Sequence, residues 1–132
     1  MRAKQSEDPL SRRERQIMDV IYSLREATAT EVVEAIADAP SRTTIRTLMR
    51  ILEEKGHLKH TKRGREFVYL PTRPRTRAGR SAMRRVVETF FSGSLEQAVA
   101  THLSDPKAHL SADELQRISD LIAQAKKKGG RS

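Results

Sequence analysis

The sequence predicts a mainly α-helical protein with one small β-hairpin. Apolar residues recur at the spacing of a helix face through most of the chain, and the pattern changes only after Gly56. Because only 4% of the residues are aromatic and 36% are hydrophobic, we expect neither a large all-β core nor an enclosed cofactor cavity. Four segments also begin with a capping box, a Ser or Thr followed three residues later by Glu or Gln. These boxes begin at Ser11, Thr28, Ser94 and Ser111.

The first 55 residues predict three consecutive helices. We expect them over residues 11–25, 28–37 and 42–55, with Gly56 ending the third because glycine readily adopts the left-handed conformation found after helix ends. Each helix has one apolar face that can pack onto a shared core. The apolar positions are Ile17, Val20, Ile21 and Leu24, then Val32, Val33 and Ile36, then Ile45, Leu48, Met49 and Leu52.

The segment after Gly56 predicts a two-stranded hairpin, and three more helices follow it. Residues 58–62 and 66–70 flank a basic turn in which Gly64 can supply a positive φ. Further helices are expected over residues 76–91, 95–103 and 115–125, where apolar residues return to helical spacing. The expected organisation is a flexible N-terminus (1–9), an N-terminal domain (10–74), a three-helix domain (75–125) and a basic flexible tail (126–132).

The positive charge of the chain is confined to its middle. The chain has 26 Lys and Arg against 17 Asp and Glu, a net charge of +9. Residues 42–80 contain 12 basic and 3 acidic side chains, so this stretch alone accounts for the whole excess. Such a concentration is typical of a surface that binds a polyanion, although a solvated flexible segment would have the same composition.

The residue types exclude several kinds of chemistry. The chain has no cysteine, so disulfides, thiol catalysis and thiolate metal sites are ruled out. The four histidines lack metal-ligand spacing and no catalytic motif is present, so we expect no metal, no cofactor and no enzyme activity. No apolar run approaches the roughly 18 residues of a membrane span, and no signal segment opens the chain, which predicts a cytoplasmic protein.

The outer face of the third helix has side chains suited to reading DNA. Arginine can donate two hydrogen bonds to guanine, threonine can contact the thymine methyl group or a phosphate, and the major groove, about 12 Å wide, admits one helix. We expect Arg46→Ala to relax sequence choice, with a loss of about 1–3 kcal/mol. The candidate residues are Arg42, Thr43, Thr44, Arg46, Thr47 and Arg50.

The hairpin repeats the positive charge at its turn. Lys62, Arg63 and Arg65 lie where a hairpin beside the reading helix would meet the DNA backbone or minor groove. A helix–helix–helix–hairpin order is that of a winged helix-turn-helix. Either basic element alone is equally well explained as a solvated surface, but the two together favour double-stranded DNA. We expect Arg63→Ala to weaken binding to all duplexes alike.

The C-terminal helices predict self-association. Short amphipathic helices are marginally stable alone, so their apolar faces need a partner surface, although they could instead fold back onto the N-terminal domain. A protein-interaction module that binds another partner is the alternative, with the basic region giving only non-specific contact with nucleic acid. RNA binding is disfavoured by the scarcity of aromatic residues. The interface candidates are Phe90, Phe91, Leu95, Val99, Leu103, Leu115, Ile118, Leu121 and Ile122.

Residues 10–125 resemble the penicillinase and methicillin-resistance repressors, the BlaI/MecI/CopY family. The string Thr44-Ile-Arg-Thr-Leu48, then Leu52, Lys55 and Gly56, carries the resemblance, with Tyr69, Phe90, Gly93 and Ser94. It implies a winged-helix homodimer that represses transcription from a palindromic operator, and it places Thr43, Thr44, Arg46, Thr47 and Arg50 in the groove.

The resemblance also implies a mode of induction. In the resembled repressors a membrane-bound sensor metalloprotease responds to β-lactam and leads to cleavage between an Asn and a Phe. The aligned pair here is Thr101 and His102, so both residues differ and the cleavage is not carried over with the dimer. Copper-responsive relatives use C-terminal cysteine pairs, which this chain lacks.

Overall fold

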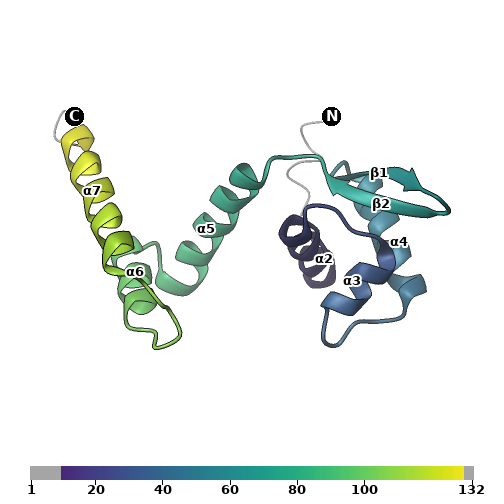
Figure 1. Cartoon of the computed structure of the whole chain (residues 1–132), viewed down its shortest axis with the longest axis horizontal. Coiled ribbons are helices and arrows are strands. Elements are labelled where there is room, and N and C mark those ends of the chain that lie inside the picture. Colours follow the sequence, from purple (N-terminus) through teal and green to yellow (C-terminus); the bar gives the residue numbers. More distant parts are fainter. Residues whose placement is uncertain (1–9, 130–132) are drawn as a thin grey trace. The chain divides into compact units, whose positions relative to one another are not determined.

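The structure, a computed structural model, confirms a mainly helical chain with one two-stranded antiparallel hairpin (Figure 1). It describes residues 10–129, so the expected flexible N-terminus (1–9) lies outside the described residues. The chain forms two compact units that divide after Ala82. The described part of the chain contains no helix long and apolar enough to cross a membrane.

The first unit begins with three helices, α2 (Arg12–Leu24), α3 (Ala29–Ala35) and α4 (Arg42–Glu54). Each begins after a hydroxyl residue whose side chain accepts a hydrogen bond from a backbone N–H of the first turn: Ser11, Thr28 and Ser41. Ser11 and Thr28 form the complete capping boxes predicted from the sequence. The helices therefore begin where their polar caps satisfy otherwise unpaired N–H groups.

The hairpin consists of β1 (Leu58–Arg63) and β2 (Glu66–Pro71), which pair from Leu58 opposite Pro71 to Arg63 opposite Glu66. Gly64 in the turn has a φ of 66°, as its position predicts. A β-bridge that the sequence does not reveal holds the hairpin to the helices. The backbone N–H of Ala27, between α2 and α3, donates to the Tyr69 carbonyl at 3.0 Å, and the Tyr69 N–H donates back at 2.8 Å.

The core of the first unit lies where α2, α3 and α4 meet the hairpin. Two residues are placed differently from the apolar faces that the sequence predicts. Leu24 is 48% exposed, because it ends α2 where Arg25, with a φ of 78°, redirects the chain. Met18, which the sequence analysis does not select, is buried. The buried hydrophobic residues are Ile17, Met18, Ile21, Ala27, Val32, Ile36, Ile45, Met49, Leu52, Leu58, Val68 and Tyr69.

The C-terminal helices are α5 (Arg75–Phe91), which contains the division after Ala82, α6 (Leu95–Leu103) and α7 (Ala112–Gly129). Ser94 and Ser111 accept from the backbone N–H three residues on, which is half of each predicted capping box. The predicted tail is wrong at its start, since α7 continues through three lysines to Gly129. Cations in the last turn interact favourably with the negative helix end. Residues 130–132 lie outside the described residues.

Candidate nucleic-acid interface

The outer face of α4 is exposed to solvent. Arg42, Thr43, Thr44, Arg46, Thr47 and Arg50 are all exposed. On the opposite side Ile45, Met49 and Leu52 have no exposed surface. The burial of one side of α4 therefore leaves the polar and basic side facing solvent, in the arrangement that a groove-reading helix requires.

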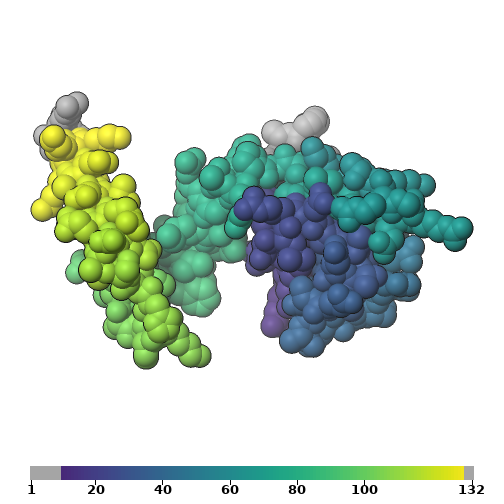
Figure 2. Space-filling view, viewed as in Figure 1, coloured from purple at the N-terminus to yellow at the C-terminus, as the bar shows by residue number. Residues whose placement is uncertain are grey.

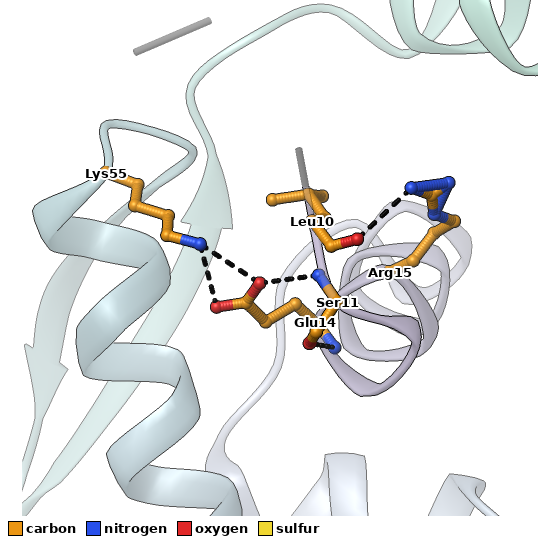
Figure 3. A network of polar contacts seen from close by, with 5 residues as sticks. All are labelled: Leu10, Ser11, Glu14, Arg15 and Lys55. Carbon is orange, nitrogen blue, oxygen red and sulfur yellow. Dashed lines mark hydrogen bonds and ion pairs between the residues drawn. The ribbon is translucent and has the colours of Figure 1, made fainter. Parts of the chain in front are cut away.

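An ion pair fixes the C-terminal end of α4 to the start of α2 (Figure 3). Lys55 Nζ lies 3.1 and 3.2 Å from the two carboxylate oxygens of Glu14. One of these oxygens also accepts from the backbone N–H of Ser11 at 2.8 Å. Burial acts to raise the pKa of Glu14, but the hydrogen bonds from Ser11 and Lys55 outweigh it, so this pKa is lowered.

The hairpin end is exposed and stands out from the helices of the first unit (Figure 2). Lys62, Arg63 and Arg65 are all exposed there, and the Lys62 ammonium lies 5.7 Å from the centre of the Phe67 ring. Arg63 Nη2 lies 2.8 Å from Glu26 Oε2, in the loop between α2 and α3. This ion pair cannot be predicted from a local sequence pattern, because its partners are 37 positions apart in the chain.

A histidine links the hairpin to α4. His60 Nδ1 lies 2.8 Å from Glu53 Oε1, and its ring stacks on Phe67 with centroids 4.1 Å apart. The fold brings this carboxylate to a histidine that has no acidic neighbour in β1. In residues 10–129 no group of three or more His, Cys, Asp or Glu side chains is placed to hold a metal ion.

A cleft of about 280 Å³ lies between the start of α3, the start of α4 and β2. Burial raises the pKa of the Tyr69 phenol and Glu53 adds to that increase, whereas Arg46 and Arg50 oppose it. The basic residues of α4 are thus close enough to act electrostatically on the wall of the cleft. The lining residues are Thr28, Ala29, Thr30, Arg42, Arg46, Arg65, Glu66, Phe67 and Tyr69.

The predicted interface residues of the second unit remain uncovered. Phe90 is 75% exposed and Leu121 is 63% exposed, and none of residues 83–129 is buried. Met83 and Val86 of α5 are exposed apolar residues as well, and they are not in the set of interface residues predicted from the sequence. Of the predicted set, Phe90, Leu95, Val99, Leu103, Leu115, Leu121 and Ile122 are exposed, and Phe91 and Ile118 are partly exposed.

Thr101 and His102 lie in the last turns of α6 and are both exposed. A peptide bond inside a helix must be unwound locally before a protease can cut it. Exposure of these two side chains therefore does not by itself make this bond a cleavage site.

Comparison with known proteins identifies the family. The profile of the penicillinase repressor family matches residues 10–124. The penicillinase repressor of Bacillus licheniformis is 27% identical over 119 residues, which span 89% of this chain and 91% of that protein.

Three solved structures are similar to part of this chain. The DNA-binding domain of the repressor BlaI is 34% identical, with 49% of this chain and 82% of that one covered and a TM-score of 0.45. The Bacillus licheniformis BlaI monomer in complex with the blaP half-operator is 33% identical, with 51% and 84% covered and a TM-score of 0.44. The CopR repressor is 36% identical, with 51% and 100% covered and a TM-score of 0.43. The match of the family profile to residues 10–124 confirms the resemblance seen in the sequence. The chain belongs to the penicillinase repressor family, whose members are transcriptional repressors and not enzymes.

Proposed function

We propose that this chain is a homodimeric repressor that binds a palindromic operator in double-stranded DNA through α4 and the hairpin. The outer face of α4 carries the proposal. Its six polar and basic residues are exposed along one side of a helix whose other side is buried. A helix anchored in this way can enter the major groove without exposing apolar residues to the DNA.

The hairpin supplies the second contact. Lys62 and Arg65 are exposed at its end, and Arg63 is held by Glu26 through an ion pair between two largely exposed side chains. Such pairs are worth only about 0–1 kcal/mol, so a phosphate can replace Glu26 as the partner of Arg63. The hairpin residues thus add affinity that depends on salt and not on base sequence.

The second unit supports the dimer. Its described residues include no buried side chain, although α5, α6 and α7 each carry large apolar residues. Helices that share no buried core are marginally stable in water unless a partner covers their apolar faces, and a second copy offers the same apolar surface. A twofold dimer presents two reading helices to half-sites about 34–36 Å apart.

Induction by proteolysis at Thr101–His102 is not included in this proposal. Both residues differ from the Asn–Phe pair of the resembled repressors, and the bond lies within α6. Proteolytic induction by a membrane-bound sensor metalloprotease predicts loss of intact protein after β-lactam challenge of the native host. We expect intact protein to persist and to remain on its operator.

Titration of duplex DNA from the region upstream of the gene, with excess random duplex as competitor, tests the proposed function. Arg50→Ala should reduce the preference for the operator by about 1–3 kcal/mol, because Arg50 lies on the outer face with 63% of its side chain exposed and only a 3.9 Å ion pair to Glu54. Lys62→Ala should weaken operator and random duplex about equally. Arg12→Ala, an exposed arginine at the start of α2, is the matched control.

The same titration distinguishes the protein-interaction module. In that case Arg50→Ala would not change the ratio of operator affinity to random-duplex affinity, because the basic region would contact any nucleic acid. Equal affinity of the unaltered protein for operator and random duplex would contradict sequence-specific repression.

A further inference from the structure

A protein that places a helix in the major groove and a hairpin at the adjacent minor groove must cross a sugar–phosphate backbone, because one backbone separates the two grooves. In this chain the cleft between α3, α4 and β2 lies between the reading helix and the hairpin. We propose that this cleft binds one backbone phosphate of the operator through Arg42, Arg46 and Arg65, an inference that rests on the proposed DNA-binding function.

The charge of the cleft fits one phosphate. Arg42 and Arg46 reach it from α4 and Arg65 reaches it from the hairpin turn, and all three side chains are exposed. The planar guanidinium group can donate two hydrogen bonds to a phosphate. The Glu66 carboxylate also lines the cleft and opposes an anion, so the four charged side chains leave a net positive charge.

One of these arginines is already held in place. Arg42 Nη1 donates to the Thr30 hydroxyl oxygen of α3 at 3.3 Å. This single exposed contact favours a position of the guanidinium group beside the cleft before any ligand binds, so less side-chain freedom is lost on binding. Thr30 is therefore a positioning residue for Arg42.

The walls of the cleft strengthen the interaction with an anion. Phe67 and Tyr69 of β2 line it, and Tyr69 is only 7% exposed. Phe67 is 40% exposed, so the buried Tyr69 side chain is the part of the wall that excludes water, which increases the attraction between a phosphate and the arginines. A volume of about 280 Å³ is enough for a phosphodiester group and several waters, at roughly 30 Å³ of liquid volume per water.

The position of the cleft divides the outer face of α4 into residues that contact the phosphate and residues that contact bases. Arg42, Arg46 and Arg50 follow one another at four-residue intervals, and each interval overshoots a helical turn by about 40°. The line of arginines consequently moves away from the cleft, which Arg42 and Arg46 line and Arg50 does not. We therefore expect Thr43, Thr47 and Arg50 to contact the bases. The sequence pattern alone predicts that Arg46 contacts the bases too, whereas its place in the cleft assigns it to the phosphate.

The decisive experiment combines protein variants with a methylphosphonate scan of the footprinted operator, in which one phosphate at a time is made neutral. For the unaltered protein, neutralising one phosphate on the backbone between the two contacted grooves should reduce affinity about tenfold, the value of a charged hydrogen bond. Arg46→Ala and Arg65→Ala should each bind more weakly and lose less affinity on that substitution than the unaltered protein does, because two of the three arginines remain. Both variants should keep the ratio of operator affinity to random-duplex affinity that the unaltered protein has. The slope of log affinity against log salt concentration should be smaller in magnitude by about 0.9.

Two further measurements test the phosphate assignment, one with a Glu66→Gln variant and one with inorganic phosphate as competitor. Glu66→Gln should tighten binding to every duplex, because it removes the one carboxylate of the cleft. Inorganic phosphate should displace DNA no more effectively than another salt at the same ionic strength. Specific displacement of DNA by millimolar inorganic phosphate would show that the cleft is a site for free phosphate and would overturn the assignment to the DNA backbone.

Failure of this inference can be told apart from failure of the proposed function. If Arg46→Ala loses operator preference but stays as sensitive as the unaltered protein to every methylphosphonate, Arg46 reads bases and the phosphate assignment is wrong. If the unaltered protein shows no operator preference at all, both the proposed function and this inference are overturned.

Discussion

At the scale of single residues, the pair formed by Glu14 and Lys55 determines how firmly α4 is held. The Glu14 side chain is only 6% exposed, and its carboxylate accepts from both the Ser11 N–H and the Lys55 ammonium. One group thus completes the N-terminal cap of α2 and fixes the C-terminal end of α4. A buried carboxylate satisfied in this way is destabilising only when one of its partners is removed.

Lys55→Met should lower the free energy of unfolding by about 1–3 kcal/mol, because it leaves the buried Glu14 carboxylate without its ammonium partner. Urea denaturation followed by circular dichroism measures this loss. The double variant with Glu14→Gln and Lys55→Met removes both charges, and it should recover part of the stability. A double variant less stable than Lys55→Met alone would contradict the argument.

The lowered pKa of Glu14 predicts a pH dependence of stability. A carboxyl group whose pKa is lower in the folded state contributes stability above its ordinary pKa, about 4.3, and this contribution disappears as the pH falls through the folded value. The difference in unfolding free energy between the unaltered protein and Glu14→Gln should therefore be largest near pH 7 and shrink below about pH 4. A difference that is constant over this range would contradict the lowered pKa.

At the scale of structural elements, the hairpin is held at both ends. The bridge between Ala27 and Tyr69 secures β2 near its base, and the ion pair between Arg63 and Glu26 lies near the turn. The same loop between α2 and α3 supplies Ala27 and Glu26. Under the proposed function, the Glu26 carboxylate would compete with DNA for Arg63, and this loop would limit the affinity of the hairpin.

Glu26→Gln should increase affinity for operator and random duplex alike, by about two- to fivefold at low salt, the equivalent of an exposed ion pair. Fluorescence anisotropy at two salt concentrations measures the change. Glu34→Gln, which removes an exposed charge from α3 without an arginine partner in β1, is the matched control. Equal gains in the two variants would mean that overall charge, and not release of Arg63, is responsible.

At the scale of the whole molecule, the two units differ in what stabilises them. The first unit has a buried core that includes residues of α2, α3, α4 and both strands, whereas none of residues 83–129 is buried. A helical unit without a buried core depends on partner contacts for its order. In the proposed dimer, association would also set operator affinity, since two linked reading helices would bind two half-sites together.

Leu121→Glu should shift the protein toward monomer, because a charge would have to be buried at the expected interface on α7. Sedimentation equilibrium measures the shift, and affinity for a two-half-site operator should fall at least tenfold while half-site binding is retained. Gln124→Glu adds the same charge to an exposed polar position of α7 and should remain dimeric. If the Leu121→Glu protein remained dimeric, this surface of α7 would not be part of the interface.

Much of the fold could be predicted from local patterns. The hydroxyl caps at Ser11 and Thr28 and the glycines at positions 56 and 64 mark the ends of elements, because those residue types satisfy backbone requirements on their own. The exposed set on α4 follows equally from the periodicity of Ile45, Met49 and Leu52. Operator binding and the interface residues stay predictions.

The amino-acid sequence by itself determined where the helices and the hairpin lie and which side of α4 faces solvent, because capping and periodicity act within a few residues. Only the tertiary structure decided the contacts between distant segments. It paired Arg63 with Glu26 and His60 with Glu53, and it placed Arg42, Arg46 and Arg65 around one cleft. Those arrangements depend on how α3, α4 and the hairpin pack, and a local pattern contains no information on packing between elements.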